Sequence, residues 1–530
     1  MLNTKQVYRG AVVAPHHLAS TAGLRVLQEG GNAVEAMIAA ASTIAVVYPH
    51  MNGLGGDNFW LINSPGQNVQ GIDACGASAT AASSQFYQEQ GLDKIPDRGP
   101  LAALTVGGAV SGWQAAFDYS SQKLQGKLPL SRLLEDAVYY AREGVAVTGT
   151  LAANAANKRA ELEPQPGFAD TYINNGKTPE LGQRLLQPKI AATLEHLVHS
   201  GLDDFYRGEL ANTLAAELAA VGSPLALEDF TRHQALSLDP LTLNVAGHQL
   251  FNMPPPTQGL ASLLLLGVYA RLGITDTDTP DYVHALVEAT KCAFRVRDRH
   301  ITDPAWMTVS PEDYLREDVL QSMAVTIDPK LAAPWPDAGD TGDTVWLGAI
   351  DQYGTAVSFI QSVYWEFGSG VVLPGTGITW QNRGTSFSLD PAHHNSLSPQ
   401  RRPFHTIQPA LARLADGRVM AYGTMGGEGQ PQTQAMVFAR HVLHNESLQH
   451  AITSPRWLLG RTWGSTATNL RIENRFVESV YAELSARGHD VERVGAFDEI
   501  MGHAGALVLN LDGRIEAAAD PRSDGSVAGF

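Results

Sequence analysis

A polar, proline-rich segment that runs directly into a β-hairpin constrains this chain more than any other feature of its sequence. Residues 325–343 contain three prolines, two glycines and four aspartates, the composition of a linker. Apolar β-forming stretches follow at 345–350 and 355–362, and the four-residue turn between them ends in Gly354. The pattern predicts that a linker meets the first strand of a hairpin at Asp343 and Thr344.

The length and composition of the chain limit the class of protein. Its 530 residues are 44% hydrophobic and 17% charged, which is enough apolar material for a sizeable core. A net charge of −17 without any Lys/Arg block argues against a nucleic-acid partner. The longest apolar run, residues 36–47, is too short to span a bilayer, and no secretory signal is visible. We therefore expect a cytoplasmic protein without a membrane partner.

Helical periodicity dominates the first 300 residues. The pattern predicts a nearly all-apolar helix from residue 33 to Pro49, a glycine loop after it, and further helices at 130–230, 260–272 and 282–300. After the hairpin, glycine turns alternate with short strands and with two helices near 431–453 and 475–488. The glycine loop at 52–57 lacks the spacing of a dinucleotide site, so we interpret it as a structural loop near the functional site.

Thr344 stands where an N-terminal nucleophile could be generated. The hydroxyl of an N-terminal threonine attacks while its own α-amine accepts the proton, so no other base is needed. Such a residue can arise inside a chain only if the bond after Asp343 is cut. Gly426 and Gly427 follow a predicted strand at 418–421, where adjacent backbone N–H groups could form an oxyanion hole. Taken alone, Thr344 could also begin an ordinary strand, and the glycines could form a plain turn.

Nine sequence blocks follow one another in one order: GGNAVEA (30–36), YPHMNGLGGDNFW (48–60), MPPPTQGL (253–260), ALVEATKCAFRVRDRHITDP (285–304), GDTVWLGAIDQYGTAVSF (342–359), FGSGVVLPGTGI (367–378), RRPFHTIQP (401–409), GTMGGEGQPQ (423–432) and ADPRSDGSVAGF (519–530). Together they resemble the γ-glutamyltranspeptidase superfamily of N-terminal nucleophile hydrolases. The resemblance implies an α+β fold, the four-layer αββα sandwich of two stacked antiparallel sheets covered by helices. We expect no cofactor and no metal, since the cysteine count and the histidine spacing fit no metal motif.

The same resemblance implies a division of the chain into two subunits. Residues 1–343, with 325–343 as the linker, would form the large subunit, and residues 344–530 the small one. The two cleaved chains are expected to remain one intertwined globule and are candidates to form a dimer of heterodimers. Asp343 and Thr344 would flank the cleavage site, with Thr344 as the nucleophile. Ser362 would supply a second hydroxyl, and Gly426 and Gly427 the oxyanion pair.

The departures from the superfamily pattern fall in the substrate pocket. The stretch CGASATAASSQF (75–86) has no basic residue where transpeptidases carry the arginine that holds the glutamyl α-carboxylate. Ser386 replaces the aspartate that receives the α-amine, and Tyr364 replaces an asparagine. His405 and Thr406 stand in place of a serine pair. An unpaired buried charge costs several kcal/mol, as an order of magnitude, so we expect poor activity on γ-glutamyl compounds.

Blocks such as VYPHMNGLGGDNFWLI (47–62) and LGRTWG (459–464) resemble the branch of the superfamily that hydrolyses oxamate to oxalate and ammonium in bacterial urate and allantoin breakdown. Oxamate is a small planar monoanion, so the site needs a carboxylate clamp beside the nucleophile. Arg383 and His405 are the candidates, although Arg383 could equally be a structural arginine in a turn. The alternatives are a γ-glutamyl hydrolase or transpeptidase-like enzyme, a β-lactam side-chain acylase, and a non-catalytic relative of the fold.

Other potentially reactive residues favour structural interpretations. The pairs His16-His17 and His393-His394 lack the spacing of a zinc motif, so surface or capping roles are expected. Cys75 and Cys292 have no CxxC partner and are expected to be reduced thiols. Neither a G-x-S-x-G elbow nor a P-loop is present in the sequence.

Overall fold

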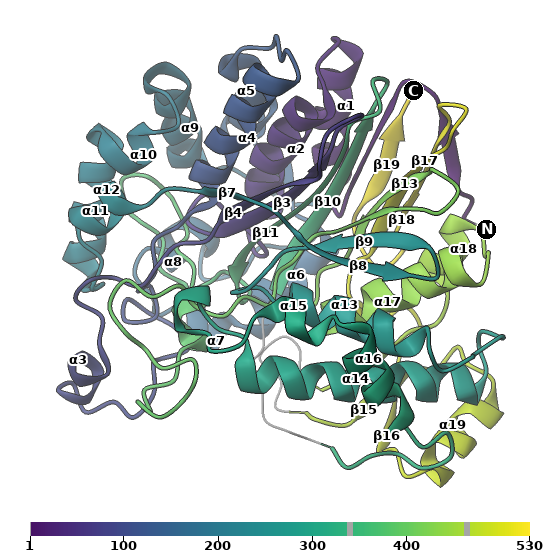
Figure 1. The fold of residues 1–530 in the computed structure, drawn as a ribbon. Coiled ribbons are helices and arrows are strands. Elements are labelled where there is room, and N and C mark those ends of the chain that lie inside the picture. Colours follow the sequence, from purple (N-terminus) through teal and green to yellow (C-terminus); the bar gives the residue numbers. More distant parts are fainter. Residues whose placement is uncertain (1, 336–342, 461–466) are drawn as a thin grey trace.

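Two seven-stranded antiparallel sheets form the centre of the molecule in the computed structural model, which describes residues 2–335, 343–460 and 467–530 (Figure 1). The first sheet has the order β19 (Ser526–Gly529), β2 (Gly10–Ala14), β10 (Asp343–Asp351), β11 (Ala356–Tyr364), β3 (Asp57–Asn63), β4 (Gln70–Ala74), β7 (Leu236–Leu238). The second has the order β1 (Lys5–Val7), β18 (Ile515–Ala519), β17 (Gly505–Leu509), β13 (Val419–Gly423), β12 (Ala410–Arg413), β9 (His248–Asn252), β8 (Leu241–Val245).

The facing sides of the two sheets enclose an apolar core that includes Trp346, two residues after Thr344. The Trp346 indole packs against Gly423, where no side chain would fit, because a Cβ on Gly423 would lie 2.2 Å from the Trp346 ring. Its Nε1 donates a hydrogen bond of 2.9 Å to Ser358 Oγ on β11. The start of β10 is therefore held firmly between the sheets.

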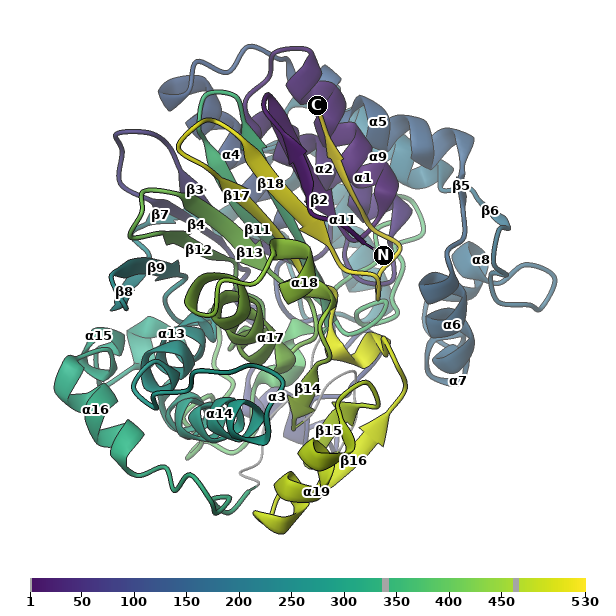
Figure 2. The same ribbon diagram turned by 90° about the vertical axis from the view of Figure 1, so that its right-hand side faces the viewer.

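Helices cover the outer face of each sheet (Figures 1 and 2). The first sheet is covered by α1 (His17–Gln28), α2 (Ala33–Val47), α4 (Ala109–Lys123), α5 (Leu130–Glu143) and α9 (Pro188–Ser200). The second is covered by α13 (Gly259–Tyr269), α14 (Pro280–His300), α17 (Gly429–Phe438) and α18 (Leu448–Thr453). This arrangement confirms the predicted αββα sandwich.

The central helix α2 shows why the sequence folds in this way. Every residue of α2 is buried, because the helix lies between the first sheet and the neighbouring helices α1 and α5. A helix in that position must be apolar on all sides, as its sequence is. Its first turn is closed by a capping box between Asn32 and Glu35, which satisfies backbone N–H groups that would otherwise be buried without partners.

The remaining elements lie at the periphery. They are α3 (Ser84–Gln88), α6 (Gly149–Asn157), α7 (Arg159–Leu162), α8 (Phe168–Tyr172), α10 (Asp204–Arg207), α11 (Glu209–Val221), α12 (Leu227–Arg232), α15 (Pro311–Tyr314), α16 (Glu317–Val325), α19 (Glu478–Ala486), β5 (Val145–Ala146), β6 (Arg184–Leu185), β14 (Trp457–Leu459), β15 (Leu470–Glu473) and β16 (Val491–Val494).

The prediction of a single helix near 431–453 is wrong. A π-helical turn at Ala439–Leu443 and a positive φ at Asn445 separate α17 from α18. Among the described residues, no helix combines the length and apolarity needed to cross a membrane.

Both sheets are built from segments on either side of residue 343. In the first sheet β10 and β11 lie between β2 and β3, and in the second β12 lies beside β9. The segment predicted as a linker starts where α16 ends, and residues 326–335 form neither helix nor strand. Residues 336–342 of that linker lie outside the described part of the chain. The predicted hairpin at 345–362 is confirmed as β10 and β11, which pair antiparallel.

Candidate active site

Thr344 lies at a β-bulge at the start of the central hairpin. Asp343 pairs with Tyr364 and Val345 pairs with Gln361, so two residues of β11 lie opposite the single residue Thr344. One of the two is Ser362. Bulges commonly redirect a side chain beside an active site. The pairing register therefore brings together the two hydroxyl-bearing residues that the sequence singled out, and both are buried.

The glycine loop at 52–57 packs directly against this bulge. Asp57, its last residue, pairs with Ser362 across β3 and β11. A Cβ on Gly56 would lie 2.1 Å from the carbonyl oxygen of Ser362, a separation that no side chain could tolerate. The expectation of a structural loop near the site is therefore met, and its glycine permits the close approach of two backbones.

Gly426 and Gly427 lie between the end of β13 and the start of α17. Their φ angles are 114° and 51°, so both occupy the region that glycine adopts without strain. The Gly427 carbonyl accepts hydrogen bonds from the Gln258 side chain at 2.8 Å and from the Gln430 backbone N–H at 3.2 Å. These contacts fix the orientation of the loop that carries the predicted oxyanion pair.

An arginine of α14 stabilises the loop of Gly426 and Gly427 through a salt bridge and a hydrogen bond. Arg297 donates to Gln258 Oε1 at 3.0 Å and lies 3.6 Å from a carboxylate oxygen of Glu428. All three side chains are buried. The predicted oxyanion loop therefore rests on a charge-compensated network that joins α14 to α17.

Arg383 is a buried cation beside the start of β10. It begins a short 3-10 helix, Arg383–Ser386, and is only 1% exposed. Its guanidinium lies 3.7 Å above the ring of Tyr364, the residue that pairs with Asp343. Nη1 donates to Thr406 Oγ1 at 3.3 Å, while Nη2 has no hydrogen-bond partner among the described residues. Burial lowers the pKa of Arg383 to about 10, so the group stays charged at neutral pH.

His405 is held by a carboxylate that the sequence analysis did not single out. Its Nε2 lies 2.9 Å from Asp57 Oδ2, and its Nδ1 lies 2.8 Å from the Pro403 carbonyl oxygen. Asp57 Oδ1 also accepts backbone N–H groups from Gly76 and Gly108. Burial and the nearby Arg383 lower the pKa of His405, whereas Asp57 opposes the shift. Each ring nitrogen of His405 therefore faces an oxygen atom of the protein, so this side chain is less available to a substrate carboxylate than Arg383 is.

The other predicted pocket residues lie on the same two segments. Thr406 accepts from Arg383, and its carbonyl oxygen accepts from Gln258 at 2.6 Å. Ser386 Oγ donates to the Phe404 carbonyl at 3.2 Å. The other four predicted substrate-binding residues thus lie near Arg383. Of these five, Arg383 alone has a polar side-chain nitrogen without a partner among the described residues.

Gln430 is a second residue that the sequence analysis missed. Its side-chain Nε2 lies 3.3 Å from Thr344 Oγ1, and both side chains are buried. The residue stood inside the block GTMGGEGQPQ (423–432), but a lone glutamine in a glycine-rich turn carries no chemical signature. Its role depends on the approach of α17 to β10, which sequence spacing does not reveal.

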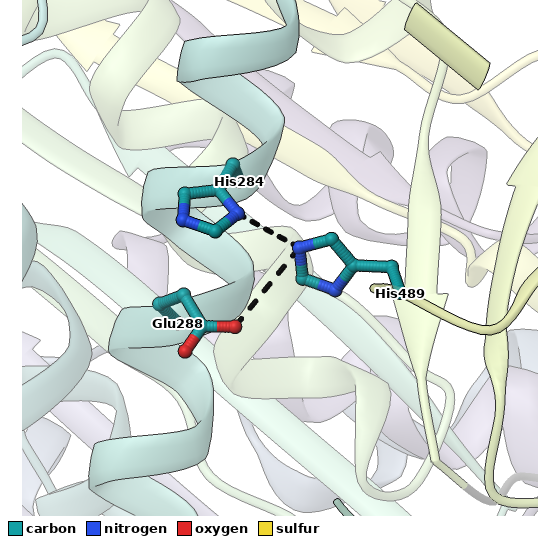
Figure 3. Close-up of side chains that lie close together, drawn as sticks. All are labelled: His284, Glu288 and His489. Carbon is teal, nitrogen blue, oxygen red and sulfur yellow. Dashed lines mark hydrogen bonds and ion pairs between the residues drawn. The ribbon is translucent and has the colours of Figure 1, made fainter. Parts of the chain in front are cut away.

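One group of described residues has the geometry of metal ligands, and it contains none of the predicted site residues. His284, Glu288 and His489 offer ligand atoms within 4.8 Å of one another (Figure 3). The Lys291 ammonium already lies 2.7 Å from Glu288 Oε1, however, and neutralises the carboxylate that a cation would need. The cluster is therefore best explained as a buried polar network of α14.

One histidine of each pair singled out in the sequence accepts a backbone N–H group. His16 caps α1 by accepting the Leu18 N–H, and His393 accepts the Asn395 N–H in a turn. Cys75 and Cys292 are both free thiols.

The chain is similar to known proteins along nearly its whole length. The model of the family described as "Gamma-glutamyltranspeptidase" matches residues 19–530. The chain is 53% identical to an oxamate amidohydrolase proenzyme of Klebsiella pneumoniae, over 98% of both chains. It is 38% identical to a glutathione hydrolase-like YwrD proenzyme of Bacillus subtilis, over 100% of this chain and 99% of the other. The crystal structure of a cephalosporin acylase from Bacillus halodurans superposes with a TM-score of 0.92 at 32% identity, covering 100% of this chain and 97% of the other.

Proposed function

The chain belongs to the γ-glutamyltranspeptidase family and is an amide-hydrolysing enzyme, and on that premise we propose that it hydrolyses oxamate to oxalate and ammonium. The 53% identity to an oxamate amidohydrolase proenzyme over nearly the full length supports this substrate. The observation that carries the proposal is the buried Nη2 of Arg383, which has no hydrogen-bond partner in the described part of the chain and belongs to a guanidinium stacked on Tyr364, beside the bulge that holds Thr344. A planar guanidinium suits the planar carboxylate that lies next to the amide carbon of oxamate.

In the proposed maturation, the precursor cuts itself between Asp343 and Thr344. The Thr344 hydroxyl attacks the Asp343 carbonyl carbon, the peptide C–N bond breaks, and an ester forms to the threonine oxygen. Water then hydrolyses the ester, which releases Asp343 as a carboxylate and leaves Thr344 with a free α-amine. The products are chains 1–343 and 344–530, which stay together because each sheet takes strands from both.

In the proposed turnover, the Thr344 hydroxyl attacks the amide carbon of oxamate while the α-amine accepts its proton. The backbone N–H groups of Gly426 and Gly427 stabilise the oxyanion. The C–N bond breaks, the α-amine returns the proton, and ammonia leaves. Water then attacks the oxalyl ester of Thr344, which regenerates the hydroxyl and releases oxalate. Arg383 binds the carboxylate throughout, and Ser362 lies beside the nucleophile.

Intact mass under denaturing conditions tests the maturation step. The wild type should give two fragments that meet at Asp343–Thr344, and Thr344→Ala should give one inactive chain of 56.8 kDa. Thr344→Ser should still mature, because it keeps the hydroxyl. A Thr344→Ala protein that is cut or active would remove Thr344 from the mechanism.

The substrate is tested separately by ammonia release from oxamate. Hydrolysis of a γ-glutamyl anilide and of a cephalosporin side-chain amide should be slower by a large factor. The acylase is the second candidate activity, because the 32% identical cephalosporin acylase shares the whole fold. The γ-glutamyl activity is less favoured, because the described pocket holds no carboxylate in the position of Ser386 to receive an α-amine. Turnover of either rival substrate above oxamate would overturn the proposal.

A further inference from the structure

We propose that Gln430 is a further catalytic residue of this site, one whose side-chain amide stabilises the negative charge that develops on the Thr344 hydroxyl oxygen. The inference rests on Thr344 being the nucleophile, as proposed above. Gln430 Nε2 lies 3.3 Å from Thr344 Oγ1, and neither side chain is accessible to water. A hydrogen bond in such a water-free setting is electrostatically stronger than one in solution.

The direction of this hydrogen bond is set by the other end of the glutamine amide. Gln430 Oε1 accepts the backbone N–H of Gln408 at 3.2 Å, so the oxygen faces Gln408 and the NH₂ group faces Thr344. An amide nitrogen can only donate, and therefore the Thr344 oxygen must accept. The hydroxyl proton of Thr344 then points away from Gln430 and is available for transfer to a base.

Its place in the first turn of α17 links Gln430 to the oxyanion loop. Its backbone N–H donates to the carbonyl oxygen of Gly427. The next two glutamines of this helix are bound elsewhere, Gln432 to the carbonyl of Leu459 and Gln434 to the carbonyl of Gln408. Among the described glutamines of α17, Gln430 alone donates to Thr344. One short segment therefore supplies donors for both oxygens that carry charge in the reaction.

The chemistry uses this donor at the points where Oγ carries charge. In the first, the Oγ–H bond breaks while Oγ bonds to the amide carbon. In the second, water attacks the ester and Oγ leaves with the electron pair before it regains a proton. A fixed donor lowers the free energy of a leaving alkoxide, as a donor in an oxyanion hole does for a carbonyl oxygen. Self-cleavage at Asp343 passes through the same ester, so the donor should accelerate maturation as well.

The variant Gln430→Met removes the donor and keeps a side chain of similar shape. The matched control is Gln432→Met, two residues further along the same helix. Removal of a preorganised donor typically slows catalysis by about 10²-fold to 10³-fold. Because 3.3 Å is a long hydrogen bond, we expect roughly 10-fold to 100-fold here. That loss should appear in kcat for oxamate with little change in KM, and in the rate of appearance of the two fragments. Gln432→Met should mature and turn over close to the wild-type rates.

Gln430→Glu separates a chemical role from a structural one. The protonated carboxyl can donate to Thr344 and the ionised carboxylate cannot, so the maturation rate relative to wild type should rise as the pH falls. Equal losses in both Met variants, or a pH-independent ratio for Gln430→Glu, would overturn the proposal. The maturation readout needs no substrate. If the wild type matures but does not hydrolyse oxamate, only the substrate assignment is wrong. The maturation rates of the Gln430 and Gln432 variants would still decide the role of Gln430.

Discussion

Replacement of Arg383 by methionine should abolish recognition of oxamate without weakening the fold. Hydrogen bonds to charged groups contribute about 1.5–3 kcal/mol each. Loss of one or two such bonds to the substrate carboxylate should lower kcat/KM for oxamate by roughly 10²-fold to 10³-fold. Oxamide, the neutral diamide of the same size, has no carboxylate to lose. Its hydrolysis should change by less than about 10-fold, so the ratio of the two substrates is the informative quantity.

The expected effect of this variant on stability has the opposite sign. Burial lowers the pKa of Arg383 to about 10, a shift that disfavours the charged form by about 3 kcal/mol. Methionine removes that cost but also gives up the Thr406 hydrogen bond and the contact with Tyr364, worth about 1 kcal/mol each. The free energy of unfolding should therefore be unchanged or higher by about 1–2 kcal/mol.

The assay is ammonia release from oxamate and oxamide, together with thermal unfolding of the same samples. Arg401→Met is the control, because Arg401 is also buried and lies over an aromatic ring but binds backbone carbonyls and Thr302. That control should lower the melting temperature and leave the substrate ratio alone. Equal losses on oxamate and oxamide in Arg383→Met would refute the carboxylate clamp, and so would a large loss of stability.

Two further predictions follow from the packing and the charges. Gly56→Ala should block maturation and lower the free energy of unfolding by about 3 kcal/mol or more, because the added Cβ would lie 2.1 Å from the Ser362 carbonyl oxygen. Gly53→Ala is the control and should be tolerated, because the nearest atom to its added Cβ lies 3.7 Å away. Equal behaviour of the two variants would contradict the argument. Burial and neighbouring carboxylates raise the pKa of Glu499 from 4.5 to about 8, so the native state holds a proton that the unfolded chain has lost, and stability should fall as the pH rises from about 4.5 to about 8. Glu499→Gln should remove that slope in thermal melts, and an unchanged slope would show that Glu499 is not its source.

The order of the sequence blocks was sufficient to predict the fold. The apolar run of α2 and the hairpin of β10 and β11 are visible in local sequence patterns. The remaining architecture followed from the blocks that the chain shares with the superfamily. The helix near 431–453 was the exception. Its helical periodicity continues through a π-turn, because the residues on both sides still face the core, so periodicity could not locate the break.

Sequence alone also pointed to Thr344, Gly426 and Gly427, which belong to recognisable blocks, and to Ser362, which lies three residues after the block 342–359. It could not decide between a turn arginine and a carboxylate clamp for Arg383. The proposed clamp draws its support from the burial of Arg383 above Tyr364 and from a nitrogen without a partner among the residues that the structure describes, and both are properties of the folded pocket.

The tertiary structure alone identified the partners of these residues. Asp57 reaches His405 across 348 positions of the chain, and Gln430 reaches Thr344 across 86. Neither contact produces a periodic or local pattern in the sequence, because each forms only when the two sheets stack and bring together segments that are distant in sequence. Local patterns and shared blocks thus determined the elements and the candidate nucleophile. The packing of the two sheets decided which side chains surround it, because charge, burial and hydrogen bonding exist only after the layers have closed.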